Sequence, residues 1–222
     1  MSSIFADAMG PEFGRLHPML QRRFGVGLDS GVACVGRGVM AEIRRGPWWT
    51  VPFLQLGRLR NILVPDTGTE VPFVIENFPY RDPLGRETVT FVREYALGGR
   101  RRRFDATMVL DAGRIVDYLG THQHLAVELD LRADDEGALV LTSGAQRFYE
   151  GPLAFRFPML CSGRARLRER FDEADGRFHV DLEVHNDRFG FLFGYRGSFD
   201  CEWVDASDAP DRLKPRRHER RT

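Results

Sequence analysis

The sequence predicts a mostly β protein in which an antiparallel meander closes or curves strongly into a lipocalin-like barrel, preceded by short helices. Two observations carry this prediction. From Glu87 to Trp203, apolar and polar residues alternate in segment after segment, as in strands that bury one face. The links between these segments are short and rich in Gly and Asp, which is typical of antiparallel hairpins. A helix-grip fold is the alternative, and the absence of a long amphipathic C-terminal helix argues against it.

The N-terminal segment 3–24 is predicted to form two short helices that plug or flank the β part. Apolar residues recur there at near-helical spacing. The pattern is interrupted at Gly10-Pro11 and at Pro18, so one continuous helix is not expected. The apolar positions are Ile4, Phe5, Met9, Phe13, Leu16, Leu20 and Phe24.

Three further elements are expected before the meander. A strand is predicted from Val32 to Arg45, and its Gly36 and Gly38 indicate a bend or bulge. An apolar segment from Pro47 to Leu56 is interpreted as a helix or lid. Strands are then predicted at Leu59–Val64 and Val71–Phe78.

The meander itself contains eight predicted strands within one domain, residues 1–204. A proline-containing loop or short helix interrupts it between Tyr149 and Ser162, and the polar residues 205–222 are predicted to be a disordered tail. The strands are Glu87–Tyr95, Arg103–Leu110, Arg114–Gly120, His124–Arg132, Leu139–Tyr149, Ser162–Phe171, Arg177–Asn186 and Gly190–Trp203.

Composition excludes several classes of function. The 222 residues carry 32 basic and 32 acidic side chains, so there is no overall charge to attract nucleic acid. Cys34, Cys161 and Cys201 are odd in number and form no CxxC, which favours reduced thiols in the cytoplasm. No signal peptide, and no apolar run of about 20 residues that would span a membrane, is seen. No cofactor motif is found, so no cofactor is predicted.

Two hairpins assign residues to faces of the sheet. The turn at Asp172–Gly176 pairs Phe171 with Phe178 and Leu167 with Leu182 on the core side. The link Asp111-Ala112-Gly113 is interpreted as a three-residue turn with Gly in the left-handed position. That interpretation places Phe104, Ala106 and Met108 on one face together with Val116 and Tyr118.

The hairpin around 133–138 carries the main site prediction. With Leu131 facing Leu139, the same inner face continues outward until Gln123 faces Arg147, and then Thr121 faces Tyr149. The face thus changes from aliphatic to polar. A buried arginine without a partner is too costly for a plain core.

A second Arg-x-Tyr sequence, Arg93 and Tyr95, also follows apolar residues on one strand face, and Tyr195 lies on the apolar face of the last strand. Two interpretations remain open. Arg93, Tyr95, Gln123, Arg147, Tyr149 and Tyr195 either hold the polar head of a small amphipathic, anionic molecule in a barrel cavity, or seal one end of a filled barrel.

His122 and His124 form the one local group that resembles a catalytic or metal site. Histidines two residues apart on a strand share a face, and the nearest candidates for a third ligand are Asp105 and Glu150. The predicted register puts the pair outside the cavity, opposite Gln123. No metal is therefore predicted, and an enzyme that uses this region is kept as an alternative function.

Long segments of the chain resemble the bacterial family catalogued as domain of unknown function 4166. They include GRETVTFVREY, VDYLGTHQHLAVELDL, SGAQRFYEG and GFLFGYRGSF, and the resemblance extends from about Ile4 to Trp203. It implies a module that can accompany dehydrogenase-like or membrane proteins, and it supplies no functional residues. A third hypothesis follows, an interaction module that docks on such a partner through Trp48 and Trp49.

Overall fold

The computed structural model describes residues 3–48, 66–156, 163–206 and 209–222. Its helices are short: α1 (Ile4–Met9), α2 (Pro18–Phe24), and 3₁₀ helices at Gly10–Arg15, Leu28–Ser30 and Asp211–Leu213. The strands are β1 (Val32–Arg45), β2 (Gly68–Asn77), β3 (Pro79–Arg81), β4 (Glu87–Thr90), β5 (Val92–Leu97), β6 (Arg100–Phe104), β7 (Ala106–Asp111), β8 (Arg114–Leu119), β9 (Leu125–Ala133), β10 (Leu139–Glu150), β11 (Leu153–Arg156), β12 (Arg164–Asp172), β13 (Arg177–Asn186) and β14 (Gly190–Asp205).

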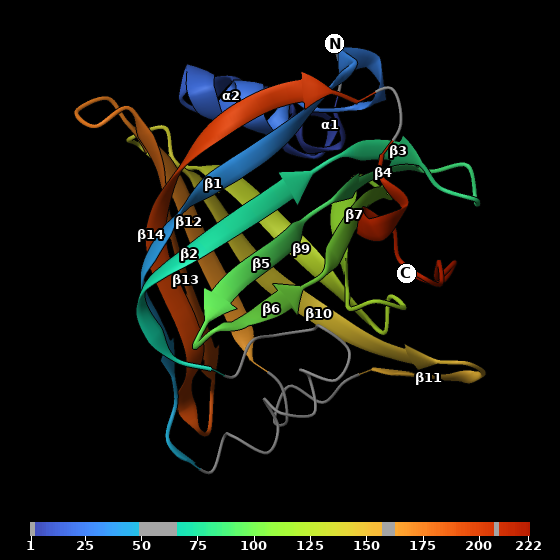
Figure 1. The fold of residues 1–222 in the computed structure, drawn as a ribbon. Coiled ribbons are helices and arrows are strands. Elements are labelled where there is room, and N and C mark those ends of the chain that lie inside the picture. The colour runs from blue at the N-terminus through green and yellow to red at the C-terminus, as the bar shows by residue number, and fades with distance from the viewer. Residues whose placement is uncertain (1–2, 49–65, 157–162, 207–208) are drawn as a thin grey trace.

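These strands form one antiparallel sheet that curls into a barrel-like shape with the helices at one end (Figure 1). Its hydrogen-bonded order is β3-β4-β7-β8-β9-β10-β12-β13-β14-β1-β2-β5-β6, and β11 pairs with β10. Single residues, Phe78, Phe91 and Asp105, separate β2 from β3, β4 from β5 and β6 from β7. The two ends of the order are therefore joined by continuous stretches of chain. The predicted fold class is confirmed.

The N-terminal helices begin where the sequence supplies caps. The Ser3 hydroxyl accepts a hydrogen bond from the amide of Ala6 and donates one to the carbonyl of Phe24, which ties the start of α1 to the end of α2. Pro18 occupies the first turn of α2, and Nδ1 of His17 caps it. The predicted division into two short helices is thus observed.

The helices bury their apolar side chains in the interior of the sheet. Phe5 and Phe24 pack edge to face at 5.1 Å between ring centroids, and both rings approach Phe91. Leu20 is fully buried. The helices therefore close one end of the barrel-like sheet as a plug. Within the described residues, no helix is long and apolar enough to cross a membrane.

The C-terminal segment 209–222 lies along the outside of the sheet, beside β3, β4 and β7 (Figure 1). Leu213 is 2% exposed in an outer apolar cluster with Phe78 and Val92. The guanidinium of Arg212 binds both carboxylate oxygens of Glu76. Where the sequence predicts a disordered tail, the structure has a packed segment, because its few apolar residues cover exposed apolar strand faces.

Predictions for part of the chain fall outside the described ranges. They concern the strand at 59–64, most of the helix or lid at 47–56, and Trp49. In the predicted loop after Tyr149, the structure instead shows β11, which forms a hairpin with β10.

Candidate ligand-binding site

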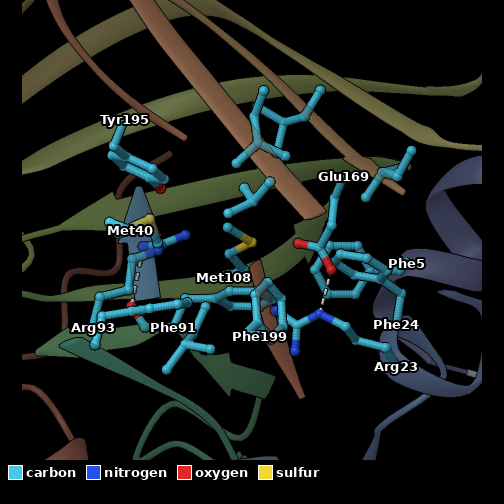
Figure 2. Close-up of a pocket in the computed structure, with 16 residues that line it drawn as sticks. Phe5, Arg23, Phe24, Met40, Phe91, Arg93, Met108, Glu169, Tyr195 and Phe199 are labelled. Carbon is cyan, nitrogen blue, oxygen red and sulfur yellow. Dashed lines mark hydrogen bonds and ion pairs between the residues drawn. The ribbon is translucent and has the colours of Figure 1, made fainter. Parts of the chain in front are cut away.

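A cavity lies in the interior between the helical plug and the strands. The cavity volume is about 30 Å³, which corresponds to two or three water molecules at roughly 10–15 Å³ each. Figure 2 shows Arg93 and Tyr195 at one end, Arg23 and Glu169 at the other, and apolar side chains between them. The lining residues include Phe5, Phe24, Met40, Phe73, Phe91, Met108 and Phe199.

Arg23 of α2 is 2% exposed and is held by several partners. Its Nε binds the carboxylate of Glu169 on β12, and its Nη1 donates to Oδ1 of Asn77 at 2.7 Å. Burial opposes the charge, but Glu169 and the neighbouring thiols outweigh it and raise the pKa of Arg23. This ion pair joins the plug to the wall of the barrel.

Arg93 of β5 is 8% exposed and has a different environment. Its Nη1 donates to the carbonyl of Phe91 at 3.3 Å, its guanidinium lies 4.9 Å from the ring centre of Phe104, and it forms no ion pair within 4.0 Å with the described residues. A buried guanidinium without a bound carboxylate is unusual, because desolvating its charge is expensive.

Asp117 of β8 is the acidic group whose charge acts on Arg93. It is 9% exposed, and its Oδ1 has no hydrogen-bond partner among the described residues. Burial raises the pKa of Asp117 to about 7, although Arg93 lowers it in part. Near neutral pH this carboxyl therefore exists in both protonation states.

Tyr95 and Tyr195 adjoin Arg93 with ring centroids 6.1 Å apart. The Tyr95 hydroxyl makes no hydrogen bond within 3.5 Å to the described residues, although Tyr195 is close enough to influence its ionisation. Burial, reinforced by Tyr195, raises the pKa of Tyr95 well above its ordinary value. The Tyr95 hydroxyl therefore stays protonated and is available as a donor.

The other predicted site residues, Gln123, Arg147 and Tyr149, lie on the outside of the sheet, away from the cavity. For Arg147 and Tyr149 the reason is an irregularity in β10: Ser143 pairs with Leu129, but Gln146 already pairs with Val127. The predicted register is also wrong within the hairpin, because Leu139 pairs with Ala133 and not with Leu131, and Arg147 pairs with Ala126 and not with Gln123. A bulge that adds a residue sends the following side chains to the opposite face.

These three residues bind the C-terminal segment. Gln123 donates to Thr107 at 2.8 Å and accepts from the amide of Glu219, while Arg147 donates to the carbonyl of Thr222. The ring of Tyr149 lies 4.6 Å from the guanidinium of Arg221. The polar groups of these residues thus bind the protein's own C-terminal segment.

The sequence reasoning missed Asp117 because of an adjacent turn. Asp111 pairs with Arg114, so the turn contains two residues, Ala112 and Gly113, at φ 46° and 79°. Both values are positive, as in the type I′ turns of tight hairpins. Met108 consequently pairs with Asp117, and the predicted grouping with Val116 and Tyr118 is wrong.

His124 is 1% exposed, and its Nδ1 lies 2.8 Å from the carboxylate of Glu150. The His122 ring is 5.2 Å away, and Asp105 binds Arg103 instead. Among the described residues, the group of three side chains that could together ligate a metal is the partly exposed turn cluster of Asp172, Asp175 and His179. The histidine pair thus lies close to Glu150 but does not form such a group.

Trp48, a predicted docking residue, is 80% exposed. Its neighbour Trp49 lies outside the described residues.

Taken together, the fold and the site define an antiparallel, barrel-like β protein with a helical plug and two buried arginines in its interior. The chain belongs to the family described as domain of unknown function (DUF4166), whose model matches residues 16–199. It is also similar to the uncharacterized protein YndH of Bacillus subtilis (strain 168), with 31% identity over 204 residues that cover 91% of this chain and 98% of YndH. The family resemblance seen in the sequence is confirmed.

Proposed function

We propose that the barrel interior binds a small amphipathic anion, with Arg93 contacting its charged head and Tyr95 and Tyr195 donating hydrogen bonds. The observation that carries this proposal is the buried guanidinium of Arg93, which has an aromatic and apolar surround but no bound carboxylate within the described part of the chain. An anionic ligand would supply the missing counter-charge.

The lining favours a ligand with an apolar body. Aromatic and methionine side chains lie between the two arginines (Figure 2). The cavity of about 30 Å³ is too small for such a body as it stands, so binding requires side chains to move. Met40 and Met108 are the most adaptable of these side chains, because methionine is unbranched and flexible.

Calorimetric titration with dodecanoate, and with dodecanol as the uncharged counterpart, tests this proposal. We expect dodecanoate to bind more tightly than dodecanol. Arg93→Gln removes charge-assisted hydrogen bonds of about 1.5–3 kcal/mol, which corresponds to roughly a 10- to 150-fold loss of affinity for dodecanoate.

Arg188→Gln is the matched control, since Arg188 is an exposed arginine on the turn between β13 and β14. It should leave dodecanoate binding unchanged. Equal binding of dodecanoate by the Arg93→Gln protein, or no binding by the natural chain, would overturn the proposal.

Binding should also depend on pH. A carboxylate ligand competes with the charge of Asp117 for Arg93, so binding favours the protonated form of Asp117, whose pKa is about 7. We expect dodecanoate affinity to increase between pH 8 and pH 6.5, and this increase to disappear in Asp117→Asn.

The proposal includes a cytoplasmic location. The free thiols Cys34 and Cys201 support it, because unpaired cysteines are typical of reducing compartments.

A further inference from the structure

Cys34 and Cys201, the thiol pair, lie on neighbouring strands beside the helical plug. Cys34 on β1 pairs with Trp203, and Cys201 on β14 pairs with Gly36, so the cysteines are diagonal neighbours on the same face. Cys34 is fully buried and Cys201 is partly exposed. The two thiols are close enough to share a hydrogen bond.

Arg23 faces both sulfurs. Its Nη1 lies 3.3 Å from Sγ of Cys34 and 3.8 Å from Sγ of Cys201. Glu169 binds only the Nε edge, and Nη2 has no hydrogen-bond partner among the described residues. A buried cation with an unused donor therefore adjoins the thiol pair and lines the cavity.

The surroundings of the two thiols shift their pKa values in opposite directions. The hydrogen bond from Cys201, and then the charge of Arg23, lower the pKa of Cys34 to about 7 against the opposing effect of burial. The same shared proton, together with burial, raises the pKa of Cys201. Cys34 also lies nearer to Nη1 of Arg23 than Cys201 does, at 3.3 Å against 3.8 Å, and the closer cation favours the thiolate at Cys34.

We propose that the thiol pair is an oxidation site for small hydroperoxides, with Cys34 as the attacking sulfur and Cys201 as the resolving one. The Cys34 thiolate attacks one peroxide oxygen: an S–O bond forms, the O–O bond breaks, and the leaving oxygen takes a proton to become an alcohol or water. Cys201 then attacks the sulfenic acid, the S–S bond forms, and water leaves. The peroxide accepts the two electrons that the thiols lose.

The guanidinium of Arg23 fits this chemistry, because its Nη1 lies beside both sulfurs and a cationic donor there can hold a peroxide oxygen and stabilise the leaving oxyanion. A metal fits less well. A soft metal needs more ligands than two thiolates, and the next group beside the two sulfurs is the Arg23 guanidinium, a cation that cannot bind a metal.

The diagonal offset indicates that the disulfide is reversible. The Cα atoms of diagonal cross-strand neighbours are typically about 7–8 Å apart, whereas unstrained disulfides join Cα atoms about 4.4–6.8 Å apart. Bond formation must draw β1 and β14 together, and such a bond is readily reduced by a small thiol.

The test uses the full chain with Cys161→Ser, which leaves the thiol pair as its only thiols. Hydrogen peroxide is added at pH 7, and the intact mass and the linked peptides are followed. We expect a disulfide between Cys34 and Cys201, reversed by dithiothreitol. It should form at least about tenfold faster than glutathione is oxidised, because a thiol with pKa near 7 is half ionised and one near 8.5 is only a few per cent ionised.

Single-serine variants separate the two roles. Cys201→Ser should accumulate a sulfenic acid at Cys34, trapped by dimedone, whereas Cys34→Ser should leave Cys201 as slow to react as glutathione. Oxidation of the two-thiol chain no faster than glutathione would overturn the proposal, and so would sulfenic acids on both cysteines without a disulfide. The main measurement needs neither serine variant, so a folding defect in one of them leaves the proposal testable.

Discussion

The two buried arginines of the cavity, Arg23 and Arg93, differ in how their charges are compensated. Arg23 binds Glu169, Asn77 and the thiol pair, whereas Arg93 has a carbonyl, an aromatic ring and the distant charge of Asp117. The charge of Arg23 is neutralised by a bound carboxylate, whereas Arg93 has no such carboxylate among the residues that the structure describes. Burial alone therefore does not determine what a buried arginine does. A bound counter-ion makes it a structural residue, and the lack of one leaves its charge available to a ligand.

The partners of Arg23 come from three separate parts of the chain. Arg23 lies on α2, Glu169 on β12 and Asn77 on β2, so the ion pair holds the plug in the barrel. Arg93 joins no such distant elements through its described hydrogen bond, which reaches Phe91 two residues away. We therefore expect Arg23 to matter for stability and Arg93 for ligand binding.

The largest expected effect comes from Glu169→Gln, which leaves the charge of Arg23 buried without its counter-ion. Breaking a buried pair in this way typically costs about 3–5 kcal/mol. We expect the free energy of unfolding in urea to fall by that amount.

Glu136→Gln on the neighbouring turn is the matched control. Glu136 also binds an arginine, Arg168, but its side chain is 78% exposed. Exposed pairs contribute about 0–1 kcal/mol, so this change should cost less than 1 kcal/mol. Similar losses in the free energy of unfolding for both variants would show that the buried Arg23–Glu169 pair stabilises the protein no more than an exposed pair does.

A smaller effect is expected from Asp117, the acidic neighbour of Arg93. Burial raises its pKa from 3.8 to about 7, so the folded protein holds this proton more tightly than the unfolded chain. The stability that the proton contributes is complete below pH 4 and is lost as the pH rises through 7. A shift of about three pKa units corresponds to at most about 4 kcal/mol, and we expect roughly 2–3 kcal/mol.

Asp117→Asn isolates this contribution, because asparagine is neutral at every pH and all other groups titrate as before. The variant and the natural protein should be equally stable near pH 4, and the variant should be more stable by roughly 2–3 kcal/mol at pH 9. A difference between the two that stays constant from pH 4 to pH 9 would show that Asp117 does not titrate in this range.

The ion pair of Arg23 and Glu169 shows which part of the site can be predicted from the sequence. The hairpin of β12 and β13 has the predicted register, with Phe171 opposite Phe178 and Leu167 opposite Leu182. Glu169 lies between Leu167 and Phe171 at alternating positions, so the sequence carried the signal of an acid on the apolar face. The pairing of Glu169 with Arg23 could not be predicted, because the two residues are distant in sequence.

Asp117 and Arg147 could not be assigned in the same way. Their faces depend on a two-residue turn and on a bulge, and each changes the register by a single residue. The turn places the non-glycine residue Ala112 at a positive φ, which its residue type does not favour. The bulge arises within β10, where the alternation gives no sign of an additional residue.

The smallest effect on stability is expected from Arg93→Met. Methionine has a comparable length, retains the contact with Phe104 and removes a charge to which no described carboxylate is bound. Replacing buried charges with apolar side chains is often neutral or stabilising. We expect the free energy of unfolding in urea, at pH 6 where Asp117 is largely protonated, to change by less than about 1 kcal/mol. A loss of 3 kcal/mol or more would make Arg93 a structural residue like Arg23, and its availability for an anionic ligand would no longer follow.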